Sequence, residues 1–446
     1  MTWAEQAAQS LTDVLRDWFS TNGVTAAAAA VDASGTVVVT SPADTPAHGR
    51  FEIGSVTKTM TATVLASLAA EGLLGLDDPI GRWLSAGANG EITIRELATH
   101  TSGLPAVAPN WREREADPAN PWAGYTFELA EEGLRQATVT PSKPWRYSNL
   151  GYQLLGLIVQ RASGQKYPVL MTERLLAPLG MTHSGVGRCG AGTPLAGHAD
   201  GRQVPQWDHP WGAGGVEATI EDMARYARAC LFPQKTPLGA AITLAQTPVL
   251  RVADDVEQGL AWAVHPGNVC EHSGASGGFS ACVITDQGRG RAVVTLVSYG
   301  ASLAFSTRLK QASLLVLGGS DPRQASEPIP WPTWREDARE VVLAMLAGRV
   351  AQVHDRLVPQ RRQRVTVEQL ENAWQKIVPH VFQQPYAFQQ PPAIQQPDVA
   401  IFRHEIAASG AVIADIAITT ADGSPRLRMV IMPNGELAGF TPAPPE

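Results

Sequence analysis

The sequence predicts an α+β fold in which helices flank an antiparallel sheet, and three observations support this class. A helical pattern at the N-terminus is followed by two short apolar runs around turn residues, as in a β-hairpin. Three further apolar or alternating runs come much later in the chain. Between these groups lie helical patterns and long Pro-, Gly- and Trp-rich loops. We therefore predict one sheet interrupted by an all-helical subdomain.

The elements of this first part follow from apolar spacing and turn residues. The hairpin turns around Asp32 and Gly35, and a buried helix begins close to Ser55 and stops at Gly72. The predicted helices are Thr2–Phe19, Thr57–Glu71, Ile94–Thr99, Phe127–Gln136, Tyr152–Ala162, Tyr167–Ala177, Ile220–Leu231 and Ala304–Leu317. The predicted strands are Val24–Val31, Val37–Thr40, Gly259–His265, Cys282–Asp286 and Ala292–Ser298, with the helical insertion over 87–208.

A shift to Pro, Ser and Gly after Gly318 predicts a linker and a second domain. We place the first domain at 1–318, the linker at 319–332 and a small β-rich domain at 333–446. The second domain has predicted helices at Trp334–Ala347 and Val367–Ile377, a surface loop at Gln383–Pro397, and strands at Ala400–Ala407, Val412–Thr419, Leu427–Met432 and Glu436–Phe440. Its fold is left open between a lipocalin-like unit and a cystatin-like or nuclear-transport-factor-like α+β unit.

Composition excludes several classes of function. The 446 residues carry 35 basic and 42 acidic side chains of interspersed sign, a net charge of −7, so we expect no nucleic-acid partner. No window approaches the ~18 apolar residues that a membrane span needs, so we expect no membrane contact. Glu5, Asp13 and Asp17 interrupt the N-terminal segment, which is therefore not predicted as a signal peptide, and a cytoplasmic location is expected.

The four cysteines show neither a metal-ligand spacing nor the density of a disulfide scaffold. We expect buried thiols, no metal and no cofactor. A bond between Cys270 and Cys282 stays open if their strands are neighbours.

The sharpest chemical feature is Ser55-Val56-Thr57-Lys58, at the point where a loop enters a helix. Residues three apart share one face of the first turn, so the lysine can act on the serine hydroxyl if burial lowers its pKa. The helix N-terminus favours negative charge that develops nearby. This spacing also arises by chance, so the motif needs partners.

Two further motifs supply such partners. Tyr147-Ser148-Asn149 can project a phenol and an amide into one cleft, where a phenolate beside Lys58 would be a general base. The alternative interpretation of the same three residues is a core tyrosine followed by a helix cap. His272-Ser273-Gly274 stands in a glycine-rich strand edge that can approach a ligand closely, or it is a plain glycine-rich turn.

Together with the blocks "ITIRELATHTSGLP", "WRYSNLGYQLLGLIV" and "GAGGVEATIEDMARYA", these motifs make residues 5–317 resemble the serine β-lactamase and penicillin-binding-protein superfamily, specifically its class C-like branch. This branch includes D-specific peptidases, family VIII esterases and acyltransferases. The resemblance implies Ser55 as acylated nucleophile, Lys58 as base or proton relay and Tyr147 as general base. It also implies a substrate amide site at Asn149, and a structural role for His100.

The resemblance further implies that backbone N–H groups of Ser55 and Ala275 form an oxyanion hole. His272, Ser273 and Gly274 would bind the substrate. His272 departs from the lysine usual in class C β-lactamases, and since histidine is only partly charged near neutrality, efficient β-lactam hydrolysis is not expected. We expect His272 to orient the carboxyl or carbonyl end of the substrate.

Among the activities of the superfamily, we favour a penicillin-binding-protein-type thioesterase. Such an enzyme releases a nonribosomal peptide thioester that ends in a D-residue, brought by a carrier protein, and closes it head to tail. The alternatives are an esterase, or a D-specific peptidase or amidase, that passes the acyl group to water; β-lactamase or DD-carboxypeptidase activity is expected less. Five loop tryptophans are predicted pocket walls for the peptidyl or acyl substrate: Trp111, Trp122, Trp145, Trp207 and Trp211.

Overall fold

The fold was analysed in a computed structural model of the chain. It describes residues 2–18, 23–114, 120–199, 202–209, 211–253, 255–300 and 303–325, parts of 341–372, and the segments 398–406, 412–419, 426–431 and 437–442. The chain divides into two compact units, one of residues 1–301 and 306–326 and one of residues 302–305 and 327–446.

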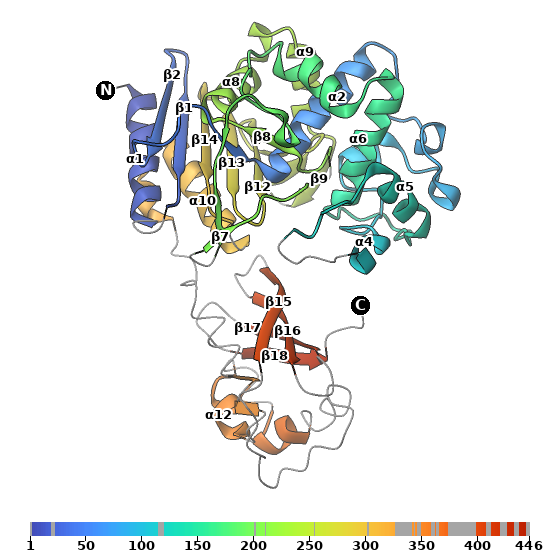
Figure 1. The fold of residues 1–446 in the computed structure, drawn as a ribbon, viewed down its shortest axis with the longest axis vertical. Helices are drawn as coiled ribbons and strands as arrows, with labels where there is room; N and C mark the ends of the chain where they lie inside the picture. Colours follow the sequence, from blue (N-terminus) through green and yellow to red (C-terminus); the bar gives the residue numbers. More distant parts are fainter. Residues whose placement is uncertain are drawn as a thin grey trace. The chain divides into compact units, whose positions relative to one another are not determined.

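An eight-stranded antiparallel sheet forms the centre of the first unit (Figure 1). Its order is β2-β1-β14-β13-β12-β11-β10-β9, so the N-terminal hairpin pairs directly with strands from the end of the unit. Ala26 of β1 lies opposite Val297 of β14, and Ser280 of β13 lies opposite Ala275 of β12. The strand bounds are β1 Ala26–Val31, β2 Thr36–Ser41, β9 Leu250–Ala253, β10 Val256–Gln258, β11 Ala263–His265, β12 Val269–Ala275, β13 Ser280–Asp286 and β14 Arg291–Val297.

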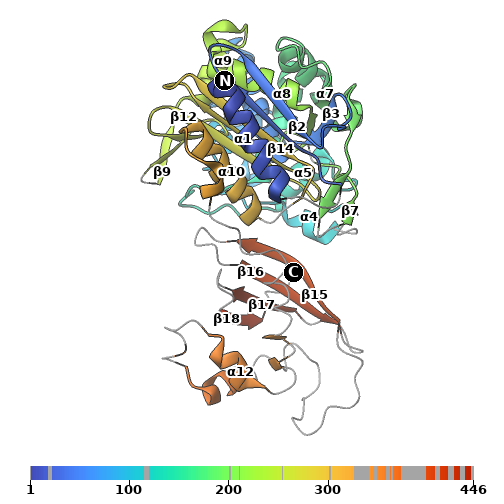
Figure 2. The ribbon, with the colours of Figure 1, turned by 90° about the vertical axis from the view of Figure 1, so that its left-hand side faces the viewer.

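Helices cover both faces of this sheet, with α1 (Trp3–Trp18) and α10 (Leu303–Leu317) on one face and α8 (Ile220–Leu231) on the other (Figure 2). The β1 sequence Ala-Ala-Ala-Ala-Ala-Val is buried along its whole length, so its small side chains let helices approach from both sides. The amphipathic α1 buries Leu11, Val14 and Leu15, as its apolar spacing predicts. The predicted α+β class with an antiparallel sheet is confirmed.

Helix α2 (Thr57–Ala70) is buried nearly all round and packs against α9 (Gly239–Gln246) and α6 (Asn149–Ser163). Three of its threonines satisfy their hydroxyls by donating to the backbone one turn back: Thr59, Thr61 and Thr63, the last to the Thr59 carbonyl at 2.9 Å. A short 3₁₀ turn, Gly54–Val56, leads into it. The buried helix therefore holds its first turn, with Ser55 and Lys58, in a fixed place.

The helical subdomain contains α3 (Ile94–Ala98), α4 (Pro109–Arg114), α5 (Phe127–Gln136), α6 and α7 (Tyr167–Met171), which continues as a π-helix over Thr172–Leu176. The predicted all-helical range of 87–208 is too long, because short strands begin at Gly185. These are β4 Gly185–Val186, β5 Thr193–Pro194, β6 Gly197–Ala199 and β7 Arg202–Val204. Two of them, β4 and β5, join β3 (Gly49–Glu52) and β8 (Val216–Ala218) in a small sheet of order β4-β8-β3-β5.

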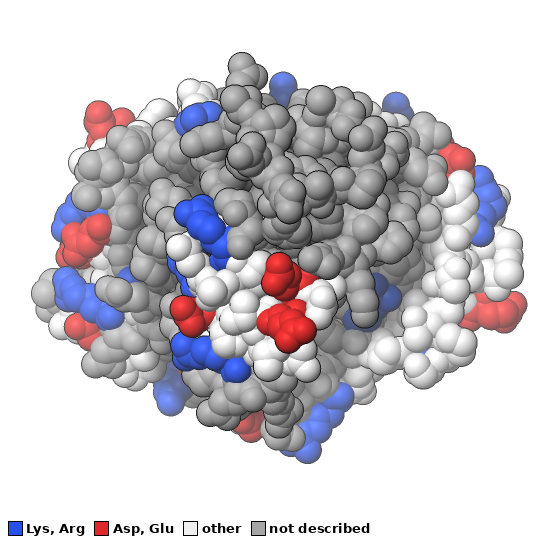
Figure 3. Space-filling model, turned by 90° about the horizontal axis from the view of Figure 1, so that it is seen from below, with Lys and Arg blue, Asp and Glu red and all other residues white. Residues whose placement is uncertain are grey.

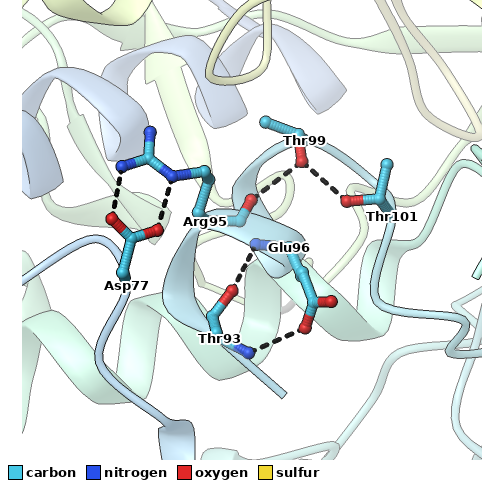
Figure 4. A network of polar contacts seen from close by, with 6 residues as sticks. All are labelled: Asp77, Thr93, Arg95, Glu96, Thr99 and Thr101. Carbon is cyan, nitrogen blue, oxygen red and sulfur yellow. Dashed lines mark hydrogen bonds and ion pairs between the residues drawn. The ribbon is translucent and has the colours of Figure 1, made fainter. Parts of the chain in front are cut away.

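Polar contacts fix both ends of α3 (Figure 4). The Thr93 hydroxyl accepts from the Glu96 N–H, and the Glu96 carboxylate accepts from the Thr93 N–H, which is a capping box. Arg95 forms a bidentate ion pair with Asp77 at 2.7 and 2.8 Å. Thr99 donates to the Arg95 carbonyl at the other end. These contacts fix the backbone that leads from α3 to His100, which lies beside the candidate site.

The second unit contains a four-stranded antiparallel sheet in the order β15-β16-β17-β18. The strands are Asp398–Ile406, Val412–Thr419, Arg426–Ile431 and Leu437–Pro442, each within two residues of a predicted strand. A short helix, α12 (Val350–Asp355), precedes them, and residues 367–372 are helical where Val367–Ile377 was predicted. The predicted loop Gln383–Pro397 and most of the predicted helix Trp334–Ala347 lie outside the described residues.

Several elements of the first unit were not predicted. Helix α9 and the strands β3, β9 and β10 lie where the sequence has short segments without a clear period. Helix α6 begins three residues earlier than predicted, because Ser148 caps it by accepting from the Gly151 N–H at 3.0 Å.

All four cysteines are free, and register explains why Cys270 and Cys282 do not pair: Cys270 lies opposite Thr285, and Cys282 opposite Ser273.

On the face shown in Figure 3, basic and acidic side chains of the described residues lie interspersed. Over the described ranges, the helices are all too short or too polar to cross a membrane, and no group of His, Cys, Asp or Glu is placed to hold a metal.

Candidate active site

The structure brings Ser55, Lys58, Tyr147 and Asn149 together around the first turn of α2. The Lys58 Nζ lies 2.9 Å from Ser55 Oγ, 2.8 Å from Asn149 Oδ1 and 2.7 Å from the Ala213 carbonyl oxygen. Lys58 is fully buried, and burial holds the pKa of its amine well below the usual value. Burial therefore favours the neutral amine of Lys58 over its ammonium form.

The three partners of Lys58 determine what a neutral amine does there. A neutral amine has two N–H donors and one lone pair. Asn149 Oδ1 and the Ala213 carbonyl can only accept, so they take the two N–H bonds. The lone pair then faces the Ser55 hydroxyl, which donates to it. This arrangement is what a base needs to take the Ser55 proton.

Tyr147 also contacts Ser55, from a position two residues before the start of α6. Its ring centre is 5.0 Å from the Lys58 Nζ, and its hydroxyl hydrogen-bonds with Ser55. Burial raises the pKa of the Tyr147 phenol above its usual value, and the bond to Ser55 only partly opposes this. The phenolate expected from the sequence is therefore not the resting form. A protonated phenol can instead pass a proton to or from Ser55.

His100 packs against the ring of Tyr147. Its backbone has φ +60°, its ring centre is 4.7 Å from that of Tyr147, and its Nδ1 accepts from the Ser148 N–H at 3.2 Å. Burial and the nearby Lys58 hold the pKa of His100 well below its usual value, so the ring is neutral. His100 thus positions the Tyr147-Ser148-Asn149 segment, in line with the structural role that the sequence suggested.

Two glycines let the first turn of α2 approach β12. A Cβ added to Gly274 would lie 2.0 Å from the Ile53 oxygen and 3.0 Å from the Ser55 nitrogen. A Cβ added to Gly54, which has φ +49°, would lie 2.7 Å from the Ala275 nitrogen. The segments that carry the Ser55 and Ala275 backbone nitrogens are thereby packed against each other, as the predicted oxyanion hole requires.

His272 is buried on the same side of β12 as Gly274, because alternate residues of a strand share a face. Its Nδ1 lies 2.7 Å from the Ser273 carbonyl oxygen and so carries the proton. Burial, followed by the charge of Lys58, lowers the pKa of His272 to about 4. The expectation of a partly charged histidine is therefore wrong: at neutral pH the ring is neutral, and its Nε2 can only accept.

Ser273 faces the other side of β12. Its hydroxyl donates to Cys282 Sγ at 3.7 Å, and its strand neighbour Glu271 forms an ion pair with Lys310 of α10 at 3.1 Å. The side chain of Ser273 thus points toward α10, away from Ser55. Of the predicted substrate-binding triplet, His272 and Gly274 lie on the face of Ser55.

The five predicted wall tryptophans do not form one group. Trp122, Trp207 and Trp211 line a pocket of about 600 Å³ beside the Gly212-Ala213-Gly214-Gly215 segment. Trp111 stacks on Trp122 at 4.7 Å, and Trp145 donates to Gln258 Oε1 at 2.9 Å; neither is among the residues that line this pocket.

Sequence reasoning missed one functional group, the Ala213 carbonyl that holds Lys58. Residue types do not reveal which backbone oxygen is functional, although the glycines around Ala213 indicate a close approach of the backbone. Gly212 has φ +87°, and a Cβ on it would lie 2.4 Å from the Tyr152 oxygen. The glycine therefore lets this segment pass close to α6 and reach Lys58.

A family model described as beta-lactamase matches residues 8–317. Penicillin-binding protein 4* of Bacillus subtilis (strain 168) is 28% identical over 263 residues, which are 52% of this chain and 57% of that protein. The protein flp of Staphylococcus aureus (strain NCTC 8325 / PS 47) is 33% identical over 141 residues, which are 30% of this chain and 28% of that protein. The match thus spans less than two thirds of either relative.

Proposed function

Since the chain belongs to the beta-lactamase family, whose members are serine hydrolases, we propose that it forms an acyl-enzyme on Ser55 and passes a peptidyl group to the amine of the same peptide. The observation that carries the first half is the arrangement of Lys58. Two fixed acceptors, Asn149 Oδ1 and the Ala213 carbonyl, direct the lone pair of its neutral amine to Ser55 Oγ, 2.9 Å away.

In the proposed acylation, Lys58 takes the Ser55 proton while Oγ attacks the thioester carbonyl. The N–H groups of Ser55 and Ala275 hold the oxyanion. When this intermediate collapses, the C–S bond breaks and the thiol leaves with the proton that Lys58 received, relayed by the Tyr147 hydroxyl. Removing one such oxyanion donor typically costs ~2.7–4 kcal/mol of transition-state stabilisation.

In the second half, the peptide amine attacks the acyl-enzyme carbonyl. The C–N bond forms, the C–Oγ bond breaks, and a proton from the amine returns to Ser55 through Tyr147 and Lys58. Water at ~55 M competes with the amine. Cyclisation therefore requires a high effective molarity, which well-oriented intramolecular reactions supply at ~10⁵–10⁸ M. The aromatic-walled pocket beside Ala213 supports this proposal, since it offers a peptide a binding surface next to the segment whose carbonyl holds Lys58.

A single assay tests both halves. The full chain is given a linear peptide thioester that ends in a D-residue, and the same peptide with an acetylated N-terminus serves as matched control. Chromatography with mass detection separates cyclic product from linear acid by one water. We expect cyclic product from the free amine, acid from the acetylated peptide and neither with Ser55→Ala. Linear acid from both peptides would show that the chain is a hydrolase and not a cyclase, and it would leave the proposed acyl-enzyme on Ser55 standing.

A further inference from the structure

The pocket that Trp122, Trp207 and Trp211 line contains buried polar groups without hydrogen-bond partners. Gln153 is 1% exposed, and neither its Nε2 nor its Oε1 has a partner. Glu52 Oε2, Glu217 Oε2 and His209 Nε2 are also buried without a hydrogen bond. All four side chains line this one pocket. Buried polar groups in folded proteins are nearly always satisfied, so a ligand or water belongs there.

The charges of this cluster do not balance. Glu52 of β3 lies directly opposite Glu217 of β8 in an antiparallel pair, which places both carboxylates on one face. Arg50 is the fully buried cation beside them, 3.5 Å from Glu217. His209 lies 3.6 Å from Glu52 and adds charge only when protonated. The two carboxylates thus share one buried guanidinium, because Arg188, the arginine in the pocket lining, pairs with Asp208 at 3.7 Å instead.

The walls of the pocket are aromatic. Besides the three tryptophans, Tyr125 and Phe127 line it, and Phe127 meets Trp211 edge to face with ring centres 5.9 Å apart. Aromatic faces attract cations through their quadrupole and also accept apolar groups. A pocket that combines such walls with a surplus carboxylate fits a cation on an apolar body.

We infer that this pocket is a binding site for an organic ammonium group carried on an aromatic or alkyl body. The ammonium would donate to Glu217 and Glu52, and the Gln153 amide oxygen would accept its third N–H. The body would lie between Trp122, Trp207 and Trp211. No bond is made or broken in this binding, and it is independent of whether Ser55 forms a cyclic or a linear product.

The site is next to the catalytic machinery but distinct from it. Gln153 is one turn after Asn149 on α6, and Gly214 and Gly215 of the pocket follow Ala213, whose carbonyl holds Lys58. An occupant would therefore contact the two segments that position Lys58. The ammonium can come from an amine that accepts the acyl group or from an effector that is not consumed.

Isothermal titration calorimetry of the full chain carrying Ser55→Ala tests the site without turnover. The probe is 2-phenylethylammonium, and the neutral control of the same shape is 2-phenylethanol. We expect the ammonium to bind and the alcohol to bind at least about tenfold more weakly, the loss that one charged hydrogen bond implies. Equal affinity for both probes would overturn the inference, whatever the product at Ser55.

Two variants locate the binding. Glu217→Gln keeps the shape of the side chain and removes its charge, and Gln153→Met removes the unpartnered amide at similar length. Each is expected to weaken ammonium binding about tenfold, whereas the exposed Glu173→Gln, which changes net charge equally, leaves it unchanged. If Glu217→Gln fails to fold, Trp211→Ala replaces it, since Trp211 is 39% exposed. Unchanged affinity in the pocket variants would place the probe elsewhere and overturn the inference.

Affinity should also rise with pH. Burial raises the pKa of Glu217 to about 7; Glu52 adds to the shift, and Arg50 and Arg188 oppose it. The other charged or titratable side chains that line the pocket are Tyr125, Glu128, Lys166, Cys189, Asp208 and His209. Binding of a cation requires the ionised Glu217, so affinity increases between pH 6 and 8. Flat affinity over this range would contradict Glu217 as the anionic partner.

A turnover experiment with active enzyme, an acyl donor and the probe distinguishes the two sources of the ammonium. Formation of an amide between the acyl group and the probe would show that the bound amine accepts the acyl group. A changed reaction rate without amide formation would show that the bound amine is an effector.

Discussion

At the scale of single residues, the site depends on one buried lysine whose three contacts leave a single direction for its lone pair. Lys58 is set by Asn149 from α6 and by the Ala213 carbonyl, so its ability to act on Ser55 is imposed by two distant segments. Neutral rings surround it, because His100 and His272 are both held below their usual pKa. The lowered pKa values of all three groups favour the uncharged forms that removal of a serine proton requires.

The pH dependence of acylation tests the neutral lysine. Since burial lowers the pKa of Lys58 and the deprotonated form is active, the rate of Ser55 labelling should rise with pH and level off well below pH 10.5. Stopped-flow acylation with a p-nitrophenyl ester measures it. Lys58→Met should lose about 10²–10⁴-fold in rate, the usual contribution of a general base. A rising limb centred at the ordinary lysine pKa would refute the assignment.

His272→Lys should shift that profile. A second cation in this buried position disfavours the ammonium form of Lys58, so the rising limb should move to lower pH. The matched control is His272→Gln, which is neutral like the native ring and should leave the limb in place. An unchanged pH profile of acylation in the lysine variant would mean that a charge at residue 272 does not affect the pKa of Lys58.

Tyr147→Phe tests the proton relay. The variant keeps the ring against His100 but removes the hydroxyl that bonds Ser55. We expect the acylation rate to fall nearly as far as with Lys58→Met, and the double variant to fall little further, because groups of one proton-transfer unit are not additive. Additive losses in this double-mutant cycle would show two independent roles.

At the scale of elements, two glycines decide whether α2 and β12 meet. Gly274 has the Ile53 carbonyl where a Cβ would stand, so no side chain fits unless the first turn of α2 moves. Ser55 and Ala275 belong to segments 220 residues apart (275 − 55), and only this contact brings their N–H groups together. The proposed oxyanion hole therefore depends on the packing of these two elements.

Gly274→Ala should separate these elements. We expect a drop in acylation of at least about 10²-fold, the cost of a lost oxyanion donor, together with reduced thermal stability. Gly35→Ala is the matched control, because nothing lies within 4 Å of a Cβ added there. Acylation rates and circular-dichroism melting report both effects. Normal acylation by Gly274→Ala would exclude the Ala275 N–H from the hole.

At the scale of the whole molecule, buried ionisable groups link stability to pH in opposite directions. Glu217 has a pKa raised to about 7, so between about pH 4.5 and 7 the folded chain binds more protons than the unfolded chain, and stability falls as pH rises. His272, with its pKa lowered to about 4, binds fewer protons when folded, so stability falls as pH drops below about 6.5.

Glu217→Gln should remove the first of these effects. In urea unfolding followed by near-ultraviolet circular dichroism, we expect the variant to lose less stability than the native chain between pH 5 and 7. Below pH 4.5 the native glutamate is protonated in both states, so the difference between the two chains should no longer change with pH. Parallel stability curves from pH 5 to 7 would show that Glu217 is not the raised group.

The sequence alone determined the local part of this protein. Amphipathic spacing placed α1, α5 and α8, and two short motifs pointed to Ser55, Lys58, Tyr147 and Asn149, because the serine and the lysine lie within one turn of a helix. Local periodicity is a property of neighbouring residues and is legible without the fold. The four strands of the second unit followed from alternation in the same way.

Only the tertiary structure decided what depends on distant segments. It showed that Ser273 faces α10 while His272 faces Ser55, since the direction of a strand residue follows from register. It made His272 neutral and Tyr147 a phenol, because burial sets a pKa and burial is known only after packing. It placed the Ala213 carbonyl on Lys58 and opposed Glu52 to Glu217, contacts 155 and 165 residues apart (213 − 58 and 217 − 52) that no local pattern encodes.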